Sequence, residues 1–329
     1  MRRIDHPSRR RFIAGLSQGT LALAMTRGGL AQTGYPNRPI RIIVGFGAGG
    51  LADITMRLVA DKLAERLGQR VIIDNRPGGG GVAAAQAVAT APPDGYTLIV
   101  LSIGNAISVG LFKSLPFDPV KDFVPVSSVA YFDLLLLVNA SSLIKTVADL
   151  LAEAKQPGNR INIGTINPGS SQNLSAELFK SVAGIDATIV PHRSTPEVLT
   201  ALLRGDVIVG VESYAALKGP IDDGQLRAIA SSGPARSLPN VPTVHESGIA
   251  NYDVTGWNAI FAPAGTPRDV VELLNREIVA IVAMPDVRKR ILDLGTEPRA
   301  STPEEIGARL KDDIKKWSAV IERAGIEKR

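Results

Sequence analysis

The strongest constraint on the fold is a repeated alternation of short apolar runs with segments of helical periodicity. Apolar runs of strand length stand at 40–44, 71–74 and 97–101. Between them lie a helical pattern that stops at Gly68 and an Ala-rich helix at 82–89. This alternation is typical of βαβ units, which build a mostly parallel sheet covered by helices. The chain is therefore predicted to be an α/β protein.

The first helix is predicted to bury one apolar stripe. Residues Ile54, Leu58, Leu63 and Leu67 recur at helical spacing, and Gly68 is expected to end the helix. The pattern thus assigns all four side chains to the side that faces the sheet.

A second βα series follows the first, and 329 residues are too many for most single cores. Its predicted strands are 134–138, 161–164, 188–190, 207–211 and 226–230, with helices at 147–155, 172–182, 196–203 and 214–222. A strand at 257–262 is expected to cross back, and three C-terminal helices complete the chain. The last begins at Thr302. We therefore predict two lobes: lobe 1 is 34–132 with 252–329, and lobe 2 is 133–251.

The N-terminal segment has the features of an export signal. Ser8–Ile13 contains a twin-arginine motif, an apolar stretch runs from Phe12 to Met25, and Gly29–Ala31 supplies small residues for cleavage. This is the order of a secretory signal peptide. We predict that 1–31 is a twin-arginine signal peptide and that the mature protein is periplasmic.

The leader also accounts for the basic charge of the chain. It holds six of the 37 Lys and Arg residues and one of the 32 Asp and Glu residues, so the remainder carries 31 of each. No basic patch is left to bind nucleic acid, and we expect no nucleic-acid partner.

The glycine-rich turn after the first strand allows an alternative function. Gly45, Gly47 and Gly50 spell G-x-G-x-x-G between a strand and a helix, and Asp74 ends the next strand. This is the dinucleotide-binding pattern, so an exported dinucleotide-dependent oxidoreductase stays open. Glycines in such a turn also let a backbone approach any anion, which is the ligand-binding interpretation.

Residues suited to acid–base or metal chemistry are scarce. After the leader only His192 and His245 remain, and the chain contains no cysteine. Neither a catalytic triad nor a metal-ligand spacing is visible. We expect no cofactor and no catalysis, and favour a binding protein.

Polar turns follow strands in both predicted lobes. In lobe 1 these are the turn Gly45–Asp53 and the pair Ser102 and Asn105; in lobe 2 they are the turn Gly164–Asn173, Arg193, and Glu212. Free N–H groups at helix starts, with Ser and Thr hydroxyls, can hold a carboxylate, and Arg193 could clamp it. Helix capping is the simpler role for Ser102, Ser170 and Ser171. The carboxylate of Glu212 could meet an amine or hydroxyl of the ligand, or simply pair with a neighbouring side chain.

These motifs, in this order, resemble the solute receptors of the tripartite tricarboxylate transporter system, the Bug receptors. The landmarks are Tyr35–Ile40, Gly49-Gly50 with Asp53, Asp74–Gly78, Asp94–Leu98, Leu115–Pro119, Glu177–Lys180, Ser247-Gly248, Trp257 and Ala262–Pro267. They span essentially the whole chain after the leader.

The resemblance implies a type II periplasmic-binding-protein fold, with a ligand cleft between two α/β lobes. It implies capture of a small carboxylate, such as a di- or tricarboxylate, an acidic amino acid or an aromatic acid. The partners would be the transporter's membrane subunits or a sensor kinase. The implied binding residues are Phe46, Gly47, Gly50, Ala52, Asp53, Ser102, Asn105, Thr165, Gly169, Ser170, Ser171, His192, Arg193, Ser194 and Glu212.

The chain also departs from the family pattern. The family usually has prolines at Gly47 and Ala48, threonine at Ala52, and tyrosine at His192. The family often has asparagine at the position of Ser108 and aspartates at the positions of Ile208 and Glu212. Several of these positions belong to the predicted site, so the resemblance does not carry the family's usual ligand over to this chain.

Overall fold

The structure is a computed structural model of the chain. It describes residues 34–77, 81–156, 158, 161–166, 170–250, 252–323 and 325–328. The predicted signal peptide and the predicted site residue Gly169 lie outside the described residues. None of the helices described is both long and apolar enough to cross a bilayer.

The first βα units form where the sequence predicts them, except for α3, which was not among the predicted helices. They comprise β1 (Ile40–Val44), α1 (Leu51–Leu67), β2 (Val71–Asn75), α2 (Val82–Ala89), β3 (Thr97–Ser102) and α3 (Ile103–Leu111). Gly68 ends α1 in the left-handed conformation, at φ 65°, which favours glycine. The prediction for Ile54 is wrong: its side chain is 41% exposed, because α1 buries Met56 and Val59 instead.

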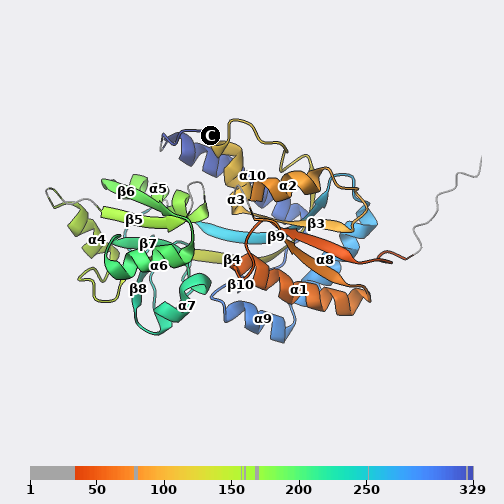
Figure 1. Cartoon of the computed structure of the whole chain (residues 1–329), viewed down its shortest axis with the longest axis horizontal. Coiled ribbons are helices and arrows are strands. Elements are labelled where there is room, and N and C mark those ends of the chain that lie inside the picture. The colour runs from red at the N-terminus through yellow and green to blue at the C-terminus, as the bar shows by residue number, and fades with distance from the viewer. Residues whose placement is uncertain are drawn as a thin grey trace, which may run out of the picture. The chain divides into compact units, whose positions relative to one another are not determined.

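The longest strand, β4 (Phe123–Asn139), is much longer than the predicted 134–138. Its first three residues belong to the proline-rich run Pro116–Pro125, which the sequence predicts to be a connection. The structure accommodates this proline beside a register shift between Pro125 and Ser127, where a ladder hydrogen bond is not required. In Figure 1, β4 and β9 (Thr255–Pro263) run between the orange and blue elements and the green ones.

The second series adds four strands and four helices. They are α4 (Val147–Ala154), β5 (Ile161–Ile166), α5 (Ser171–Ala183), β6 (Ala187–His192), α6 (Thr195–Arg204), β7 (Val209–Ser213), α7 (Tyr214–Asp222) and β8 (Leu226–Ser231). Strands β5, β6 and β7 are parallel, as predicted from the βα alternation. Their carboxyl ends lead directly into α5, α6 and α7.

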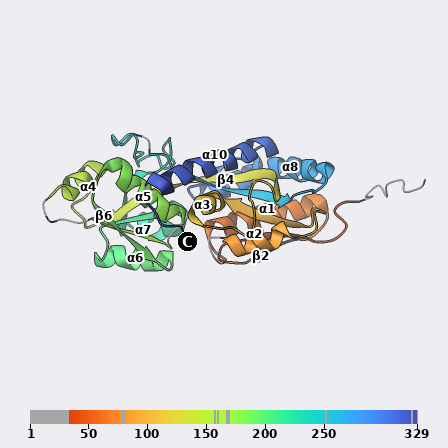
Figure 2. The same cartoon turned by 90° about the horizontal axis from the view of Figure 1, so that it is seen from above.

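The C-terminal part contains the three predicted helices. They are α8 (Arg268–Val282), α9 (Pro285–Leu292) and α10 (Pro303–Arg323), with the short strand β10 (Glu297–Pro298) between the last two. Thr302 and Glu305 form the predicted capping box, since each backbone N–H donates to the other's side chain. Helix α10 packs on both α3 and β4 (Figure 2).

The strands form one sheet whose pairing changes along β4. The order is β2-β1-β3-β9-β4-β7-β5-β6, with β8 and β10 also paired to β4. Up to Asp133, β4 pairs with β9, and from Leu134 it pairs with β7. Residues 38–329 nevertheless form one unit by their contacts. The lobe boundaries therefore stay a prediction, and lobe 1 and lobe 2 are used below for those ranges.

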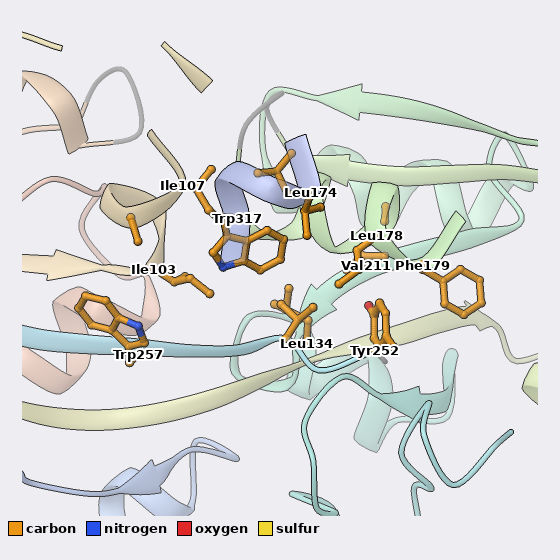
Figure 3. Close-up of a cluster of buried hydrophobic side chains, with 14 of the residues drawn as sticks. Ile103, Ile107, Leu134, Leu174, Leu178, Phe179, Val211, Tyr252, Trp257 and Trp317 are labelled. Atoms are coloured by element: carbon orange, nitrogen blue, oxygen red, sulfur yellow. The ribbon is translucent and has the colours of Figure 1, made fainter. Parts of the chain in front are cut away.

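The core is continuous across this change of partners. Ile103 and Ile107 of α3, Leu174 and Leu178 of α5, and Trp317 of α10 belong to one cluster of buried side chains (Figure 3). Trp257 of β9 is fully buried in the same cluster. Its indole Nε1 donates to Asp313 Oδ2 of α10 at 2.7 Å, which satisfies the one polar atom that burial would leave unpaired.

Candidate functional site

The glycine turn after β1 is close-packed at only one of its pattern glycines. A Cβ on Gly45 would stand 2.7 Å from the Cα of Gly81, so only glycine fits there. Gly47 has no heavy atom within 4 Å of such a Cβ, and the nearest atom to one on Gly50 is 3.5 Å away. The dinucleotide pattern uses its third glycine for close packing of helix on strand. Gly50 makes no such contact, so the turn matches the dinucleotide pattern in sequence but not in packing.

Asp74 forms ion pairs with two arginines, whereas the dinucleotide alternative requires it to bond a ribose hydroxyl. Its carboxylate accepts from Arg41 Nη2 at 2.6 Å and from Arg76 Nη2 at 3.0 Å. These guanidinium groups, Arg76 first, hold the pKa of Asp74 below its usual value. Both arginines bond the same carboxylate oxygen, Oδ2.

The start of α1 is held by Asp53, which is 3% exposed. Its Oδ2 accepts from the backbone N–H of Gly49 at 2.8 Å, and Arg57 Nη2 lies 2.9 Å from its Oδ1. Burial alone would raise the pKa of Asp53, but the bonds from Arg57, Gly49 and Asn75 lower it overall. The turn carries no net charge of its own, because Arg57 balances Asp53.

The first turn of α1 offers free backbone donors. Gly50 is its N-cap, is exposed, and has no side chain to bond the first N–H groups. Such groups have no partner within a helix, and they favour an anion. Phe46 is partly buried, and its carbonyl accepts from Asn75 Nδ2 at 3.1 Å, while Ala52 is buried.

Ser102 and Asn105 begin α3, a helix that the sequence analysis did not predict. Ser102 Oγ accepts from Gly104 N, and Asn105 Oδ1 accepts from Ser102 N at 2.9 Å. Both side chains are buried and form a capping box, which was the simpler interpretation of Ser102. Asn105 Nδ2 lies 3.6 Å from the position of a Cβ on Gly81, so α3 meets the turn around Gly45 and Gly81.

In lobe 2 the predicted residues Thr165 and Ser170 form a bonded group with α5. Ser170 is the N-cap: its Oγ accepts from Asn173 N at 3.1 Å and donates to Ile166 O. Asn173 Nδ2 donates to Thr165 Oγ1 at 3.3 Å. Capping, the simpler role proposed for Ser170, is therefore confirmed.

Glu212 is the centre of a second bonded group in lobe 2. It is 1% exposed, and its Oε1 accepts from Gln172 Nε2 at 2.9 Å and from Ser213 N at 2.7 Å. Its Oε2 accepts from Thr195 Oγ1 at 2.7 Å. The Ser171 hydroxyl extends the chain by donating to Gln172 Oε1. Gln172 and Thr195 belong to the two polar segments that follow predicted strands of lobe 2, but neither was among the predicted binding residues.

The residues at the end of β6 and just after it have fewer hydrogen-bond partners than the two groups above. The Nε2 atom of His192 is buried and has no hydrogen-bond partner. Arg193 is exposed, and only its backbone N–H is bonded, to Glu197 Oε2. Ser194 is the N-cap of α6, but its side chain makes no capping bond.

The predicted residues thus fall into two groups, one in each lobe. Among the described residues, no hydrogen bond or ion pair joins the two. One hollow of about 330 Å³ lies outside both groups and is lined by Asn139, Leu203 and Ile208 among others. Within the described ranges no cluster of His, Asp and Glu could hold a metal ion.

Comparison with known sequences gives a family. The family described as tripartite tricarboxylate transporter family receptor matches residues 55–326. A protein encoded in the tcbD-tcbE intergenic region of Pseudomonas sp. (strain P51) is 33% identical over 319 residues, covering 95% of this chain and 94% of its own length. BugT of Bordetella pertussis is 33% identical over 295 residues, which cover 88% and 90%.

Solved structures agree. Rpa4515 of R. palustris, determined with adipate, is 33% identical with a TM-score of 0.82, covering 90% of this chain and 100% of that one. MatC from Rhodopseudomonas palustris, with bound malate, is 31% identical with a TM-score of 0.78, covering 87% and 100%. The periplasmic binding protein BugD is 27% identical with a TM-score of 0.79, covering 90% and 100%.

These matches confirm the predicted two-lobe α/β solute-binding fold. The chain belongs to the tripartite tricarboxylate transporter receptor family, and it is a periplasmic solute-binding receptor.

Proposed function

We propose that this receptor captures a small carboxylate and that the first turn of α1 holds the carboxylate group. The observation that carries the proposal is the uncapped, exposed start of α1 at Gly50, beside a balanced Asp53–Arg57 pair. Relatives solved with adipate and malate support the ligand class. In open α/β sheets ligands bind beyond the carboxyl ends of parallel strands, where this turn stands.

Lobe 2 would supply the second surface. The starts of α5 and α6 follow parallel strands in the same way, and Ser194 keeps a hydroxyl that caps nothing. Ligand would be held between the lobes, with the closed form selected by binding. No bond of the ligand would be made or broken.

The route to the periplasm and the downstream partner are part of the same proposal. The twin-arginine motif in 1–31 would direct export. The closed receptor would then meet the membrane subunits of a tripartite tricarboxylate transporter. A sensor kinase is the second candidate, because it would read the same closed form.

A thermal-shift screen of the protein from Gln32 onward tests the proposal. The panel holds mono-, di- and tricarboxylates, acidic amino acids, aromatic acids and nicotinamide dinucleotides. A ligand at about 100 times its Kd adds roughly 2.7 kcal/mol to the free energy of unfolding. We expect a shift with at least one carboxylate and none with dinucleotides. A shift with a dinucleotide alone would restore the oxidoreductase alternative.

A further inference from the structure

The two segments that link lobe 1 and lobe 2 are bonded to each other through one serine. On the predicted boundaries, the chain enters lobe 2 at Leu134 of β4 and has left it at Val254, just before β9. Ser232 is 3% exposed; its N–H donates to Leu134 O, and its carbonyl accepts from Val254 N–H, both at 2.8 Å. Its Oγ accepts from Leu134 N at 2.8 Å and donates to Val254 O at 2.5 Å. A hinge motion of the lobes would therefore bend the chain next to Ser232.

Asp133 stands immediately before Leu134, and its carboxylate lies against the loop that contains Ser232. A Cβ on Gly233 would overlap this carboxylate, so the carboxylate is in close contact with the backbone of that loop. Ser237 of the same loop donates a hydrogen bond to it. On this side, Asp133 is thus held by lobe 2.

Two further carboxylates face Asp133 from lobe 1. Asp253 belongs to the segment that returns from lobe 2 and Glu297 to β10, and both repel the charge of Asp133. Within the described part of the chain Asp133 forms no ion pair, because the basic side chains of the surrounding segments bond other groups. These are Lys316 with Asp253, Arg309 with Asp313, Arg236 with Glu246, Arg288 with the carbonyl of Pro298, and Arg299 over the ring of Tyr131.

This position favours the neutral form of Asp133. Burial, together with the two carboxylates, raises its pKa to about 6 against the bond from Ser237. An ionised Asp133 would be stabilised by any movement of the lobes that admits water to it or draws Asp253 and Glu297 away. Protonation and the arrangement of the lobes are therefore linked, because Asp133 binds its proton more tightly in one arrangement than in the other.

We propose that Asp133 is a pH-sensitive element of the hinge: its protonation favours the arrangement of the lobes in this structure, and its ionisation favours one in which its carboxylate reaches water. A receptor that binds its ligand by closing the lobes would then change its affinity with pH through this side chain, since only one arrangement is competent to bind. The inference goes beyond the proposed function, and its test requires no ligand.

The test measures the distance between the lobes without ligand. Because the chain contains no cysteine, Ala87→Cys in α2 and Thr200→Cys in α6 give two unique and exposed sites for spin labels. Double electron–electron resonance then reports the distribution of their distance between pH 5 and pH 8. The labelled protein is compared with the same protein carrying Asp133→Asn, which keeps the shape of the side chain and stays neutral. Asp223→Asn is the control, since it removes one exposed charge from lobe 2.

We expect two populations without the Asp133 substitution, whose ratio changes at least about fivefold from pH 5 to pH 8, with a midpoint at pH of about 6. Asp223→Asn should show the same change. Asp133→Asn should keep, at every pH, the distribution that the unsubstituted protein shows at pH 5. A distribution that does not respond to pH without the Asp133 substitution would overturn the inference, as would an equal response in Asp133→Asn. Either of these results would leave the proposed function standing.

Should Asp133→Asn fail to fold, as judged by circular dichroism, Asp133→Ser takes its place. It is also neutral and is smaller, and the same results would support or overturn the inference.

Discussion

The two lobes treat a buried carboxylate in opposite ways at the carboxyl ends of their parallel strands. In lobe 1, Asp53 bonds the turn before α1 and is balanced by Arg57. In lobe 2, Glu212 bonds the starts of α5 and α6 and is balanced by no arginine or lysine within the described residues. Lobe 1 is thus left attractive to an anion, whereas the anion position of lobe 2 is already taken.

The difference shows that helix starts alone do not define an anion site. Both lobes have helices that begin directly after parallel strands. Whether they attract an anion depends on the side chains that reach them first, because a buried charge outweighs the partial charge of a helix end.

Removing the two carboxylates should affect stability unequally. Glu212→Ala leaves buried donors of Gln172, Thr195 and Ser213 unsatisfied, and we expect a loss of about 3 kcal/mol. Asp53→Ala leaves Arg57, whose side chain is half exposed, free to turn into water, and should cost only about 1–2 kcal/mol. Urea unfolding of both variants measures the difference. Equal losses in the free energy of unfolding would mean that the two buried carboxylates contribute equally to the stability of their lobes.

The anion site in lobe 1 can be blocked without disturbing the fold. Gly50 has extended backbone, φ −78° and ψ 168°, and room for a Cβ, so Gly50→Val should fold. Its side chain would cover the free N–H groups of α1 and weaken carboxylate binding by about 100-fold. Ala216→Val, at an exposed position of α7, is the control. Unchanged affinity in Gly50→Val would show that the ligand does not bind at this turn.

The point where β4 changes partners should respond to pH. Burial raises the pKa of Asp133 to about 6, against a hydrogen bond from Ser237 and with repulsion from Asp253 and Glu297. The folded state therefore favours the protonated form, and stability is lost as pH rises from about 4 through about 6. Since Asp133 is still partly exposed, we expect Asp133→Asn to be more stable than the wild type by about 1–2 kcal/mol at pH 7.5.

Thermal melts of Asp133→Asn and of the wild type between pH 4 and pH 8 check this prediction. The gain should vanish near pH 4, where both proteins are neutral at this position. A constant difference across the range would assign the effect to packing. The exposed Asp223→Asn serves as the control for a lost charge.

The smallest effects should come from the serines that cap helices. Ser102→Ala and Ser170→Ala each remove the side-chain bond at the start of a helix and should cost about 1 kcal/mol. Because Ser102 is 3% exposed, its loss should leave ligand affinity within about twofold in a titration. A larger loss of affinity would show that Ser102 contacts the ligand.

Local patterns predicted most of the fold, and tertiary contacts account for the errors. The strands at 40–44 and 226–230 and the helix at 82–89 could be recognised from apolar runs and stop signals alone. Pro125 hid the start of β4, because a bulge that accepts proline depends on the neighbouring strand. Helix α3 was missed because the run Ser102–Leu111 contains two glycines and no charge to mark an exposed face.

The candidate site was harder to predict from the sequence than the fold was. Ser170 was recognisable as a cap from its place before α5. The role of Glu212 was not, because its partners Gln172 and Thr195 are 40 and 17 positions away, and only the order of β5, β6 and β7 in the sheet brings them together. Charge compensation at Asp53 could have been predicted, because Arg57 stands four positions later on the predicted helix.

The central claim is that the first turn of α1 holds a carboxylate of the ligand. A crystal structure of the protein with the carboxylate that gives the largest thermal shift tests it most directly. We predict a carboxylate within hydrogen-bonding distance of the first backbone N–H groups of α1. A carboxylate bound among the starts of α5 and α6, with nothing at α1, would contradict it.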